Sequence, residues 1–181
     1  LLPEAKRFSV AQRHETRETC WFVHDCFAQA NLSGYDCHGD VRVCAEADNP
    51  KRHYLRLQSG AGISRACETS GQDELSMALD VPAGTAALNF AGVTVQLGGA
   101  QASINGQNVP DIADSRYVVA FKRFHAPQRC EVWLNNRPAM MCACDAAAKT
   151  SFTLTASEAG EIRLNRVDWK DQTDVPILVE N

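Results

Sequence analysis

Leu75-Ser76-Met77-Ala78-Leu79-Asp80-Val81 is the stretch that decides the fold. Its large apolar residues occupy every second position, and small or acidic residues stand between them. Successive side chains of a β-strand point to opposite faces, so this pattern predicts a strand with one buried face. The same alternation recurs over residues 93–97. Residues 117–124 are apolar on both faces, which predicts a strand at the centre of a sheet.

Turn signals separate these segments at regular intervals. Asn105-Gly106 predicts a two-residue hairpin, because both residues tolerate the positive φ that a type I′ turn requires. The alternation slips by one residue between Leu164 and Val167, which predicts a β-bulge. The strand spacing, with about nine to eleven strands, is typical of an all-β, two-sheet antiparallel β-sandwich.

Length and composition suit one soluble domain. We expect residues 1–19 to form a polar N-terminal arm and residues 20–181 to form a single sandwich domain. The contents of 45% hydrophobic and 22% charged residues are ordinary for such a domain. The net charge of −4 argues against a nucleic-acid partner. No segment approaches the ~20 apolar residues of a membrane span, so we expect no membrane insertion.

Eight cysteines without metal-finger spacing favour a disulfide framework over a zinc site. Such a framework predicts an oxidising compartment, and therefore a secreted, extracellular protein. Asn31-Leu32-Ser33 is a sequon that would accept a glycan at Asn31 on that route. The eight are Cys20, Cys26, Cys37, Cys44, Cys67, Cys130, Cys142 and Cys144.

One cysteine pair can be placed from the sequence. A three-residue loop over residues 135–137 would put Leu134 opposite Pro138 and Cys130 opposite Cys142. The two cysteines would then be close enough to bridge the hairpin. A two-residue loop would break that pairing.

The order of segments resembles a known fold. Residues 117–124 precede Val132-Trp133-Leu134-Asn135-Asn136-Arg137-Pro138, and residues 152–155 and 161–168 follow. This order resembles the concanavalin A-like and laminin-G-like jelly rolls over roughly residues 37–170. Asn136 stands where those domains usually carry glycine, and the cysteine density is above theirs. The resemblance implies a jelly-roll sandwich.

No catalytic pattern stands out. Glu131 is a lone acid on its strand, and the Glu-x-Asp-x-x-Glu pattern of laminarinase-like enzymes is absent. A Ser–His–Asp triad stays open because it assembles in space, although no Gly-x-Ser-x-Gly elbow supports it. A jelly-roll polysaccharide hydrolase or lyase remains an alternative that requires two convergent carboxylates or a His–Tyr–Arg group. We therefore favour a non-catalytic protein.

Basic and aromatic residues are the candidate ligand contacts. The clusters at residues 51–53 and 122–125 would bind sulfated or carboxylated glycans if they met on one face, and are otherwise solvated strand ends. Trp133 lies on the strand face opposite Cys130 and would stack on a sugar ring if exposed. Burial against the N-terminal arm is the alternative. The candidate ligand-binding residues are Arg52, Tyr54, Lys122, Arg123 and Trp133.

Calcium is the cofactor that the resemblance implies, since laminin-G-like domains often hold it at the loop rim. Asp111 and Asp114 in one loop are the candidate oxygen donors, with Asp168, Asp171 and Asp174 as further candidates, because Ca²⁺ takes six to eight oxygens that converge from loops. Aspartate also forms turns without any metal. No other cofactor is expected.

These observations favour a secreted recognition module that binds glycan or protein through its loops or concave sheet face. The alternative is a structural or adhesion subunit of an extracellular homo- or hetero-assembly. Such a subunit would bind its neighbours through exposed edge strands or the N-terminal arm.

Overall fold

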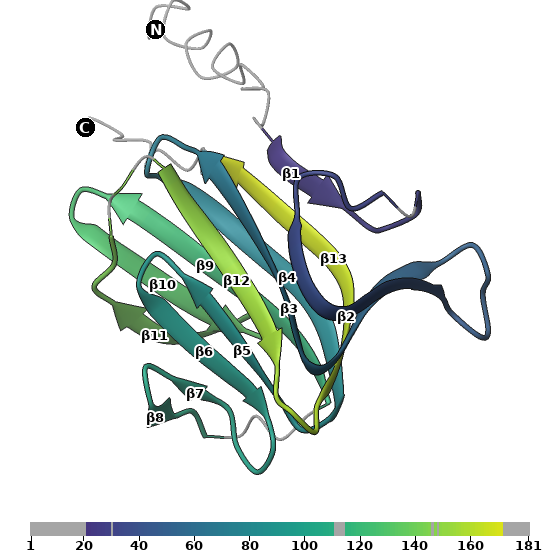
Figure 1. The fold of residues 1–181 in the computed structure, drawn as a ribbon. Helices are drawn as coiled ribbons and strands as arrows, with labels where there is room; N and C mark the ends of the chain where they lie inside the picture. The colour runs from purple at the N-terminus through teal and green to yellow at the C-terminus, as the bar shows by residue number, and fades with distance from the viewer. Residues whose placement is uncertain (1–20, 30, 111–114, 146, 148, 172–181) are drawn as a thin grey trace, which may run out of the picture.

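The computed structural model describes residues 21–29, 31–110, 115–145, 147 and 149–171. Within these residues the chain forms thirteen strands and no helix (Figure 1). The strands are β1 (Trp21–Asp25), β2 (Asp36–Ala45), β3 (His53–Glu68), β4 (Asp73–Ala83), β5 (Thr85–Phe90), β6 (Val93–Gly98), β7 (Ser103–Ile104), β8 (Gln107–Asn108), β9 (Arg116–His125), β10 (Gln128–Leu134), β11 (Arg137–Cys142), β12 (Lys149–Ala156) and β13 (Glu161–Asp171).

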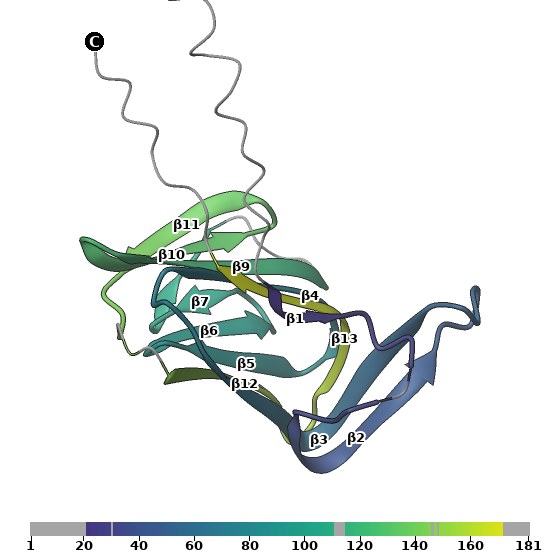
Figure 2. The ribbon, with the colours of Figure 1, turned by 90° about the horizontal axis from the view of Figure 1, so that it is seen from above.

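The strands form two facing antiparallel layers, as Figure 2 shows. The first layer has the order β11-β10-β9-β4-β13, and β1 pairs with β13. The second layer has the order β12-β5-β6-β7-β8. This arrangement confirms the predicted all-β sandwich. The described residues hold more strands than predicted, partly because β7 and β8 have two residues each and are too short to show alternation.

The ribbon of β2 and β3 joins the two layers. Residues 53–58 of β3 pair with residues 40–45 of β2, and residues 55–58 also pair with β13. Residues 62–68 of β3 pair with β12 of the second layer. The bend lies at Gly39 in β2, with φ of 75°, and at Ser59 and Gly60 in β3, with φ of 53° and 78°. A Cβ at Gly39 would lie 2.9 Å from the Cα of Ala61, so only glycine fits this crossing.

The hydrophobic core lies between the layers. Leu75, Met77 and Leu79 of β4 are buried, as their alternation predicts. Trp169 of β13 is 0% exposed, and its ring meets the rings of Phe90 and Phe152 at centroid distances of 5.5 and 6.0 Å. These two rings come from the second layer, so aromatic contacts fasten the layers together.

The predicted local features are partly confirmed. Asn105-Gly106 closes a two-residue hairpin with φ of 48° and 77°, and Ile104 pairs with Gln107. β9 lies between β10 and β4, as expected of a central strand. The predicted bulge also occurs, because the register with β4 shifts between Leu164 and Arg166.

The hairpin between β10 and β11 differs from the prediction. Its loop has two residues, Asn135-Asn136, with φ of 49° and 63°, and Leu134 pairs with Arg137. The predicted three-residue loop is therefore wrong. A register shift between residues 132 and 133 restores the pairing further along, so Cys130 still lies opposite Cys142.

The structure does not show the predicted disulfide framework. The seven cysteines of the described residues are free thiols, and Cys20 lies outside those residues, as does the predicted arm at 1–19. Register explains part of this result: Cys37 pairs with Ile63, Cys44 with Tyr54 and Cys67 with Thr150. These three cysteines, together with Cys26, Cys130, Cys142 and Cys144, make up the seven. Among the described residues, no helix is long and apolar enough to cross a bilayer.

Candidate functional site

The outward face of the first layer carries a groove with a floor of small side chains. Trp133 of β10 pairs with Ala120 of β9, and Ala120 pairs with Ser76 of β4. In the next row Val118 pairs with Ala78. Alternation sends these side chains away from the core, because their strand neighbours are the buried core residues. The large side chain of Trp133 therefore lies beside the short side chains of Ala120 and Ser76, which form a low floor.

Two hollows lie along this floor on the outward face. The smaller, of about 200 Å³, is lined by Ser76, Ala120, Lys122 and Trp133 among others. The larger, of about 620 Å³, is lined by β4, β9 and the loop between β2 and β3. Both hollows include Val118, so they are neighbours on this face. The larger volume falls in the range of about 300–1,000 Å³ that small-molecule sites occupy.

Trp133 and Lys122 lie in the groove as a contacting pair. The Nζ of Lys122 is 4.5 Å from the centroid of the Trp133 ring. Val132 and Leu134 on either side of Trp133 are 0% exposed, so the indole is on the outward face as predicted. A half-buried indole held by a cation presents a fixed aromatic surface at the edge of the hollow.

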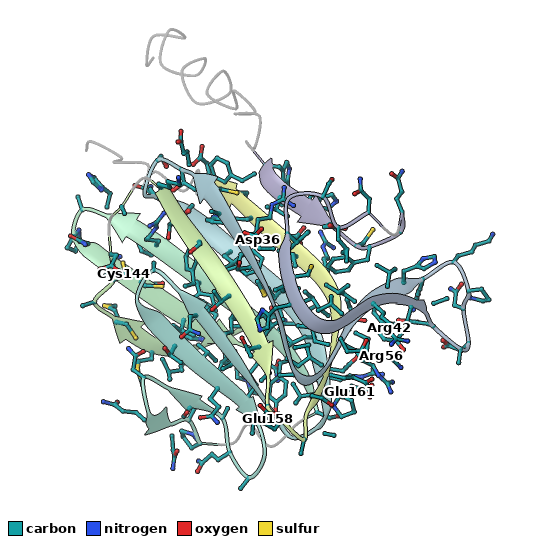
Figure 3. All side chains as sticks on the ribbon, in the orientation of Figure 1. Asp36, Arg42, Arg56, Cys144, Glu158 and Glu161 are labelled. Carbon is teal, nitrogen blue, oxygen red and sulfur yellow. The ribbon has the colours of Figure 1, made fainter. Side chains whose placement is uncertain are left out.

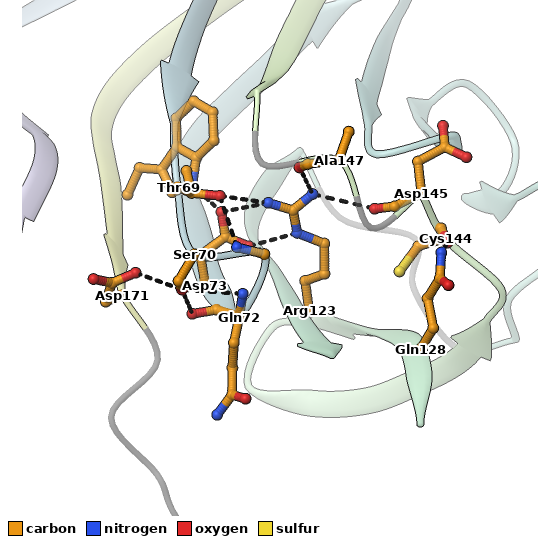
Figure 4. Close-up of polar contacts among 12 residues, drawn as sticks. Thr69, Ser70, Gln72, Asp73, Arg123, Gln128, Cys144, Asp145, Ala147 and Asp171 are labelled. Carbon is orange, nitrogen blue, oxygen red and sulfur yellow. Dashed lines mark hydrogen bonds and ion pairs between the residues drawn. The ribbon is translucent and has the colours of Figure 1, made fainter. Parts of the chain in front are cut away.

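Arg123 has a different role from the one predicted. Its side chain is 0% exposed, and its guanidinium reaches Asp73 at 2.7 and 3.0 Å and Thr69 Oγ1 at 2.7 Å. The same guanidinium donates to the carbonyls of Asp145 and Ala147, both at 3.1 Å (Figure 4). Lys122 and Arg123 are adjacent in β9 and so face opposite ways. The prediction that Arg123 contacts a surface ligand is therefore wrong.

The other two predicted contacts lie on the outward face. Arg52 is exposed in the β2–β3 loop and lines the larger hollow. That loop is closed by a bond of 2.9 Å from the amide of Glu46 to the carbonyl of Arg52. Tyr54 is half-buried, and the Arg163 guanidinium lies 5.6 Å from its ring centroid. Arg52 and Lys122 therefore share one face of the molecule but line different hollows.

Carboxylates on this face alternate with lysines. Glu131 of β10 pairs with Lys122, Lys122 pairs with Glu74 of β4, and Glu74 pairs with Lys170 of β13. Neighbouring strands are about 4.8 Å apart, so a lysine-bearing strand separates the two glutamates by about 10 Å of backbone. Retaining glycosidases hold two carboxyls about 5–5.5 Å apart, and inverting ones about 6.5–9.5 Å apart. In this row Lys122 lies between the two glutamates, and each glutamate is in an ion pair, Glu131 with Arg129 and Glu74 with Lys170.

A histidine–aspartate pair lies at the edge of the same layer. His24 Nδ1 is 2.7 Å from Asp168 Oδ1, and Asp168 lies between His24 and Ser76 in the strand register. A Ser–His–Asp triad needs the imidazole between the hydroxyl and the carboxylate. The order here is different, so these three residues do not form a triad.

Metal ligands are not gathered in the described part of the chain. No group of three or more described His, Cys, Asp or Glu side chains could hold a metal ion. The predicted calcium donors Asp111 and Asp114 lie outside the described residues. Calcium binding at that loop therefore stays a prediction.

One cluster on this face was not predicted from the sequence. Arg42, Arg56 and Arg163 lie on three neighbouring strands in direct register. Each stands between two apolar residues in its own strand, and this is the signal that marks it as outward-facing. Their proximity depends on which strands pair, which the sequence does not reveal.

Comparison with known proteins yields structural likeness only. No family model and no curated protein matches this chain. Similar solved structures include a sialidase, with 14% identity and a TM-score of 0.66 over 83% of this chain. The chain spans only 18% of the length of that sialidase. A Bacillus licheniformis β-glucanase has 12% identity and a TM-score of 0.56, with coverage of 84% of this chain and 99% of its own.

A third similar structure is the carbohydrate recognition domain of Emp46p in a potassium-bound form. It has 8% identity and a TM-score of 0.53, with coverage of 81% of this chain and 95% of its own. Identities this low show the fold and no more. The chain has a concanavalin A-like jelly-roll β-sandwich fold.

Proposed function

We propose that this chain binds a glycan in the groove of the first layer as a non-catalytic recognition module. The observation that carries the proposal is the placement of Trp133 beside the low floor of Ala120 and Ser76, next to a larger polar hollow. An indole can stack on the apolar face of a sugar ring, and a low floor leaves room for that ring. Amide, carboxylate and guanidinium groups around the larger hollow suit sugar hydroxyls.

The comparisons support a carbohydrate ligand. One structural neighbour is named as a carbohydrate recognition domain and another as a β-glucanase. The charge pattern favours recognition over hydrolysis, because Lys122 stands between Glu131 and Glu74 in the strand register. Secretion and glycosylation remain predictions. Asn31 is exposed in the loop after β1, where its Oδ1 accepts a bond of 2.9 Å from the amide of Ser33.

A glycan array compared with a tryptophan variant tests the proposal. Wild-type protein is expected to retain a defined set of oligosaccharides, and Trp133→Ala is expected to weaken their binding about tenfold through loss of the stacking surface. Trp21→Ala is the matched control, because Trp21 is 46% exposed on β1 and lines neither hollow. An array on which the wild-type protein retains no glycan would contradict the proposal.

The non-catalytic half of the proposal has its own test. Retained oligosaccharides are incubated with the protein, and new reducing ends or unsaturated products are measured over time. No turnover is expected. Turnover that disappears in Glu131→Ala would show that the chain is an enzyme.

A further inference from the structure

Three arginines lie side by side where β2, β3 and β13 are neighbours, and we call them the arginine row. Arg42 of β2 pairs with Arg56 of β3, and Arg56 pairs with Arg163 of β13. Leu55 and Leu57 on either side of Arg56 are 0% exposed, so the row points outward. Side chains directly opposite one another have Cβ atoms about 5 Å apart. Figure 3 shows Arg42 and Arg56 close together, with Glu161 beside them.

Two of the three guanidinium groups are in an ion pair with a carboxylate. Arg42 Nε lies 2.7 Å from Asp40 Oδ1, and Arg163 Nε lies 2.7 Å from Glu161 Oε1. Arg56 lies between these pairs. Among the described residues, no carboxylate oxygen is within 4.0 Å of the Arg56 guanidinium nitrogens. The central member of the row is therefore the one without an ion pair there.

Both oxygens of the Glu161 carboxylate have a hydrogen-bond partner. Its Oε1 meets Arg163, and its Oε2 accepts a bond of 2.9 Å from Gln58 Nε2. The hydrogen bond from Arg163, with smaller effects from Gln58 and from the charge of Arg56, lowers the pKa of Glu161 below its ordinary value, so the acid is ionised at neutral pH. The three arginines and their two ion-paired acids then hold three positive and two negative charges. Asp80, opposite Arg163 on β4, is itself in an ion pair with Arg116 at 3.3 Å. Like charges directly opposite one another destabilise a sheet, and a bound anion would remove that cost.

The arginine row borders the groove. Arg163 pairs with Asp80 of β4, and Asp80 lines the larger hollow. Tyr54 precedes Arg56 by two residues on the same strand face, and its ring packs against Arg163. The side chains of Arg42 and Arg163 are 66% and 46% exposed, so both are accessible from solvent.

We propose that the arginine row is a subsite for one carboxylate or sulfate group carried by the glycan that the groove binds. This inference rests on the proposed function of the groove. Guanidinium groups form paired hydrogen bonds to planar carboxylates and to tetrahedral oxyanions, and an anion centred on Arg56 meets two further arginines. The ligand class is therefore an acidic oligosaccharide.

Free anions test the subsite without a glycan. Sodium sulfate and sodium glucuronate are titrated separately at constant ionic strength, with sodium chloride as the reference, while the arginine Nε–Hε signals are followed by NMR. Saturable shifts at Arg56, Arg42 and Arg163 are expected with at least one of the two anions. If sulfate and glucuronate each give shifts that rise linearly with concentration and equal those given by chloride, the subsite is overturned. The titration that saturates at lower concentration identifies the preferred group.

Variants link the subsite to glycan binding. Oligoglucuronate, a sulfated gluco-oligosaccharide and a neutral gluco-oligosaccharide of equal length are compared by calorimetry. Arg56→Gln is expected to weaken binding of the preferred acidic ligand at least tenfold and to leave the neutral ligand unchanged. Arg56→Lys keeps the charge but loses the planar guanidinium that forms two parallel hydrogen bonds, so it is also expected to bind the acidic ligand more weakly. Lys149→Gln removes one charge from an exposed position on β12 and is the matched control.

The outcomes separate this inference from the proposed function. If Trp133→Ala weakens glycan binding while Arg56→Gln leaves the acidic ligand unchanged, the groove stands and the anion subsite is overturned. If no oligosaccharide binds but the Arg56 signal saturates with sulfate or glucuronate, the subsite stands and the proposed function fails. Unchanged backbone spectra of both Arg56 variants establish that folding is intact.

Discussion

Arg123 carries a full charge into the core through five hydrogen bonds to its guanidinium. Asp73, its carboxylate partner, is also 0% exposed and accepts a further bond of 2.8 Å from the indole of Trp169. The network joins β9 to β4 and β13, and to the segment that follows β11 (Figure 4). Removing one member of a buried ion pair leaves the other charge without compensation.

Loss of this arginine is expected to be costly for stability. Arg123→Met should lower the free energy of unfolding by about 3–5 kcal/mol, because Asp73 would stay buried without its partner. Urea unfolding followed by tryptophan fluorescence measures the change. Arg137→Ala, at an exposed position on β11, is the matched control and should change stability by less than about 1 kcal/mol. Equal stabilities of the two variants would contradict a structural role for Arg123.

At the scale of elements, the β2–β3 ribbon determines how the two layers meet. Its strands cross from one layer to the other within a few residues, at Gly39 in β2 and at Ser59 and Gly60 in β3. The contact between Gly39 and Ala61 is so close that the crossing has no room for a side chain. The same ribbon carries Arg42 and Arg56, and its loop lines the larger hollow.

Two glycine variants separate close packing from backbone strain. Gly39 and Gly106 have nearly equal φ of 75° and 77°, but a Cβ at Gly106 would meet nothing within 4 Å. Gly106→Ala should therefore lose only about 1 kcal/mol, the cost of positive φ. Gly39→Ala should lose more than that, because its Cβ collides with backbone atoms of β3. Thermal unfolding measures both, and a smaller loss for Gly39→Ala would contradict the account of the bend.

At the scale of the whole molecule, the state of the cysteine thiols tests the prediction that the protein is secreted into an oxidising compartment. Burial, with smaller effects from Cys144 and Cys142, raises the pKa of Cys130 well above its ordinary value, so this thiol stays protonated at neutral pH. Cys130 and Cys142 nevertheless lie opposite one another on neighbouring strands. Directly opposed positions have Cα atoms about 4.5–5.5 Å apart, within the range that a disulfide spans.

We expect this pair to bridge under oxidising conditions. Folding the protein in a buffer of reduced and oxidised glutathione should produce a Cys130–Cys142 disulfide, with its electrons passing to oxidised glutathione. Peptide mapping by mass spectrometry detects the bridge, and Cys142→Ser is the control that lacks it. Free thiols at both positions after complete folding would contradict the prediction, and would also weaken the case for a secreted protein.

Local pattern explains which parts of the fold were predictable. The alternation around Met77 and the turn at Asn105 each depend on a few adjacent residues, so the sequence predicted both correctly. The loop at Asn135 was wrong because a register shift further along β10 compensated for a shorter turn. Arg123 was misassigned because β9 is apolar on both faces, and alternation alone does not say which face points inward.

The candidate site was harder to predict than the fold. Trp133 and Lys122 were predicted as ligand contacts, and the structure places both in one hollow of the outward face. Their role in binding stays a prediction. The arginine row was not found, because Arg42, Arg56 and Arg163 come from distant parts of the chain and meet only through strand pairing. Pairing order is set by packing of the whole sandwich, and no short stretch of sequence contains it.

The long strand β3 limits where this chain can change its length. Because side chains alternate, one residue inserted between Arg56 and Ser59 would turn Arg56 toward the core and bring a leucine out to water. The tip at residues 46–52 is free of that restriction, since it lies outside both strands. Insertions there would reshape one wall of the larger hollow and leave the guanidinium groups in line. Variants with new ligand preferences are therefore best sought at this tip.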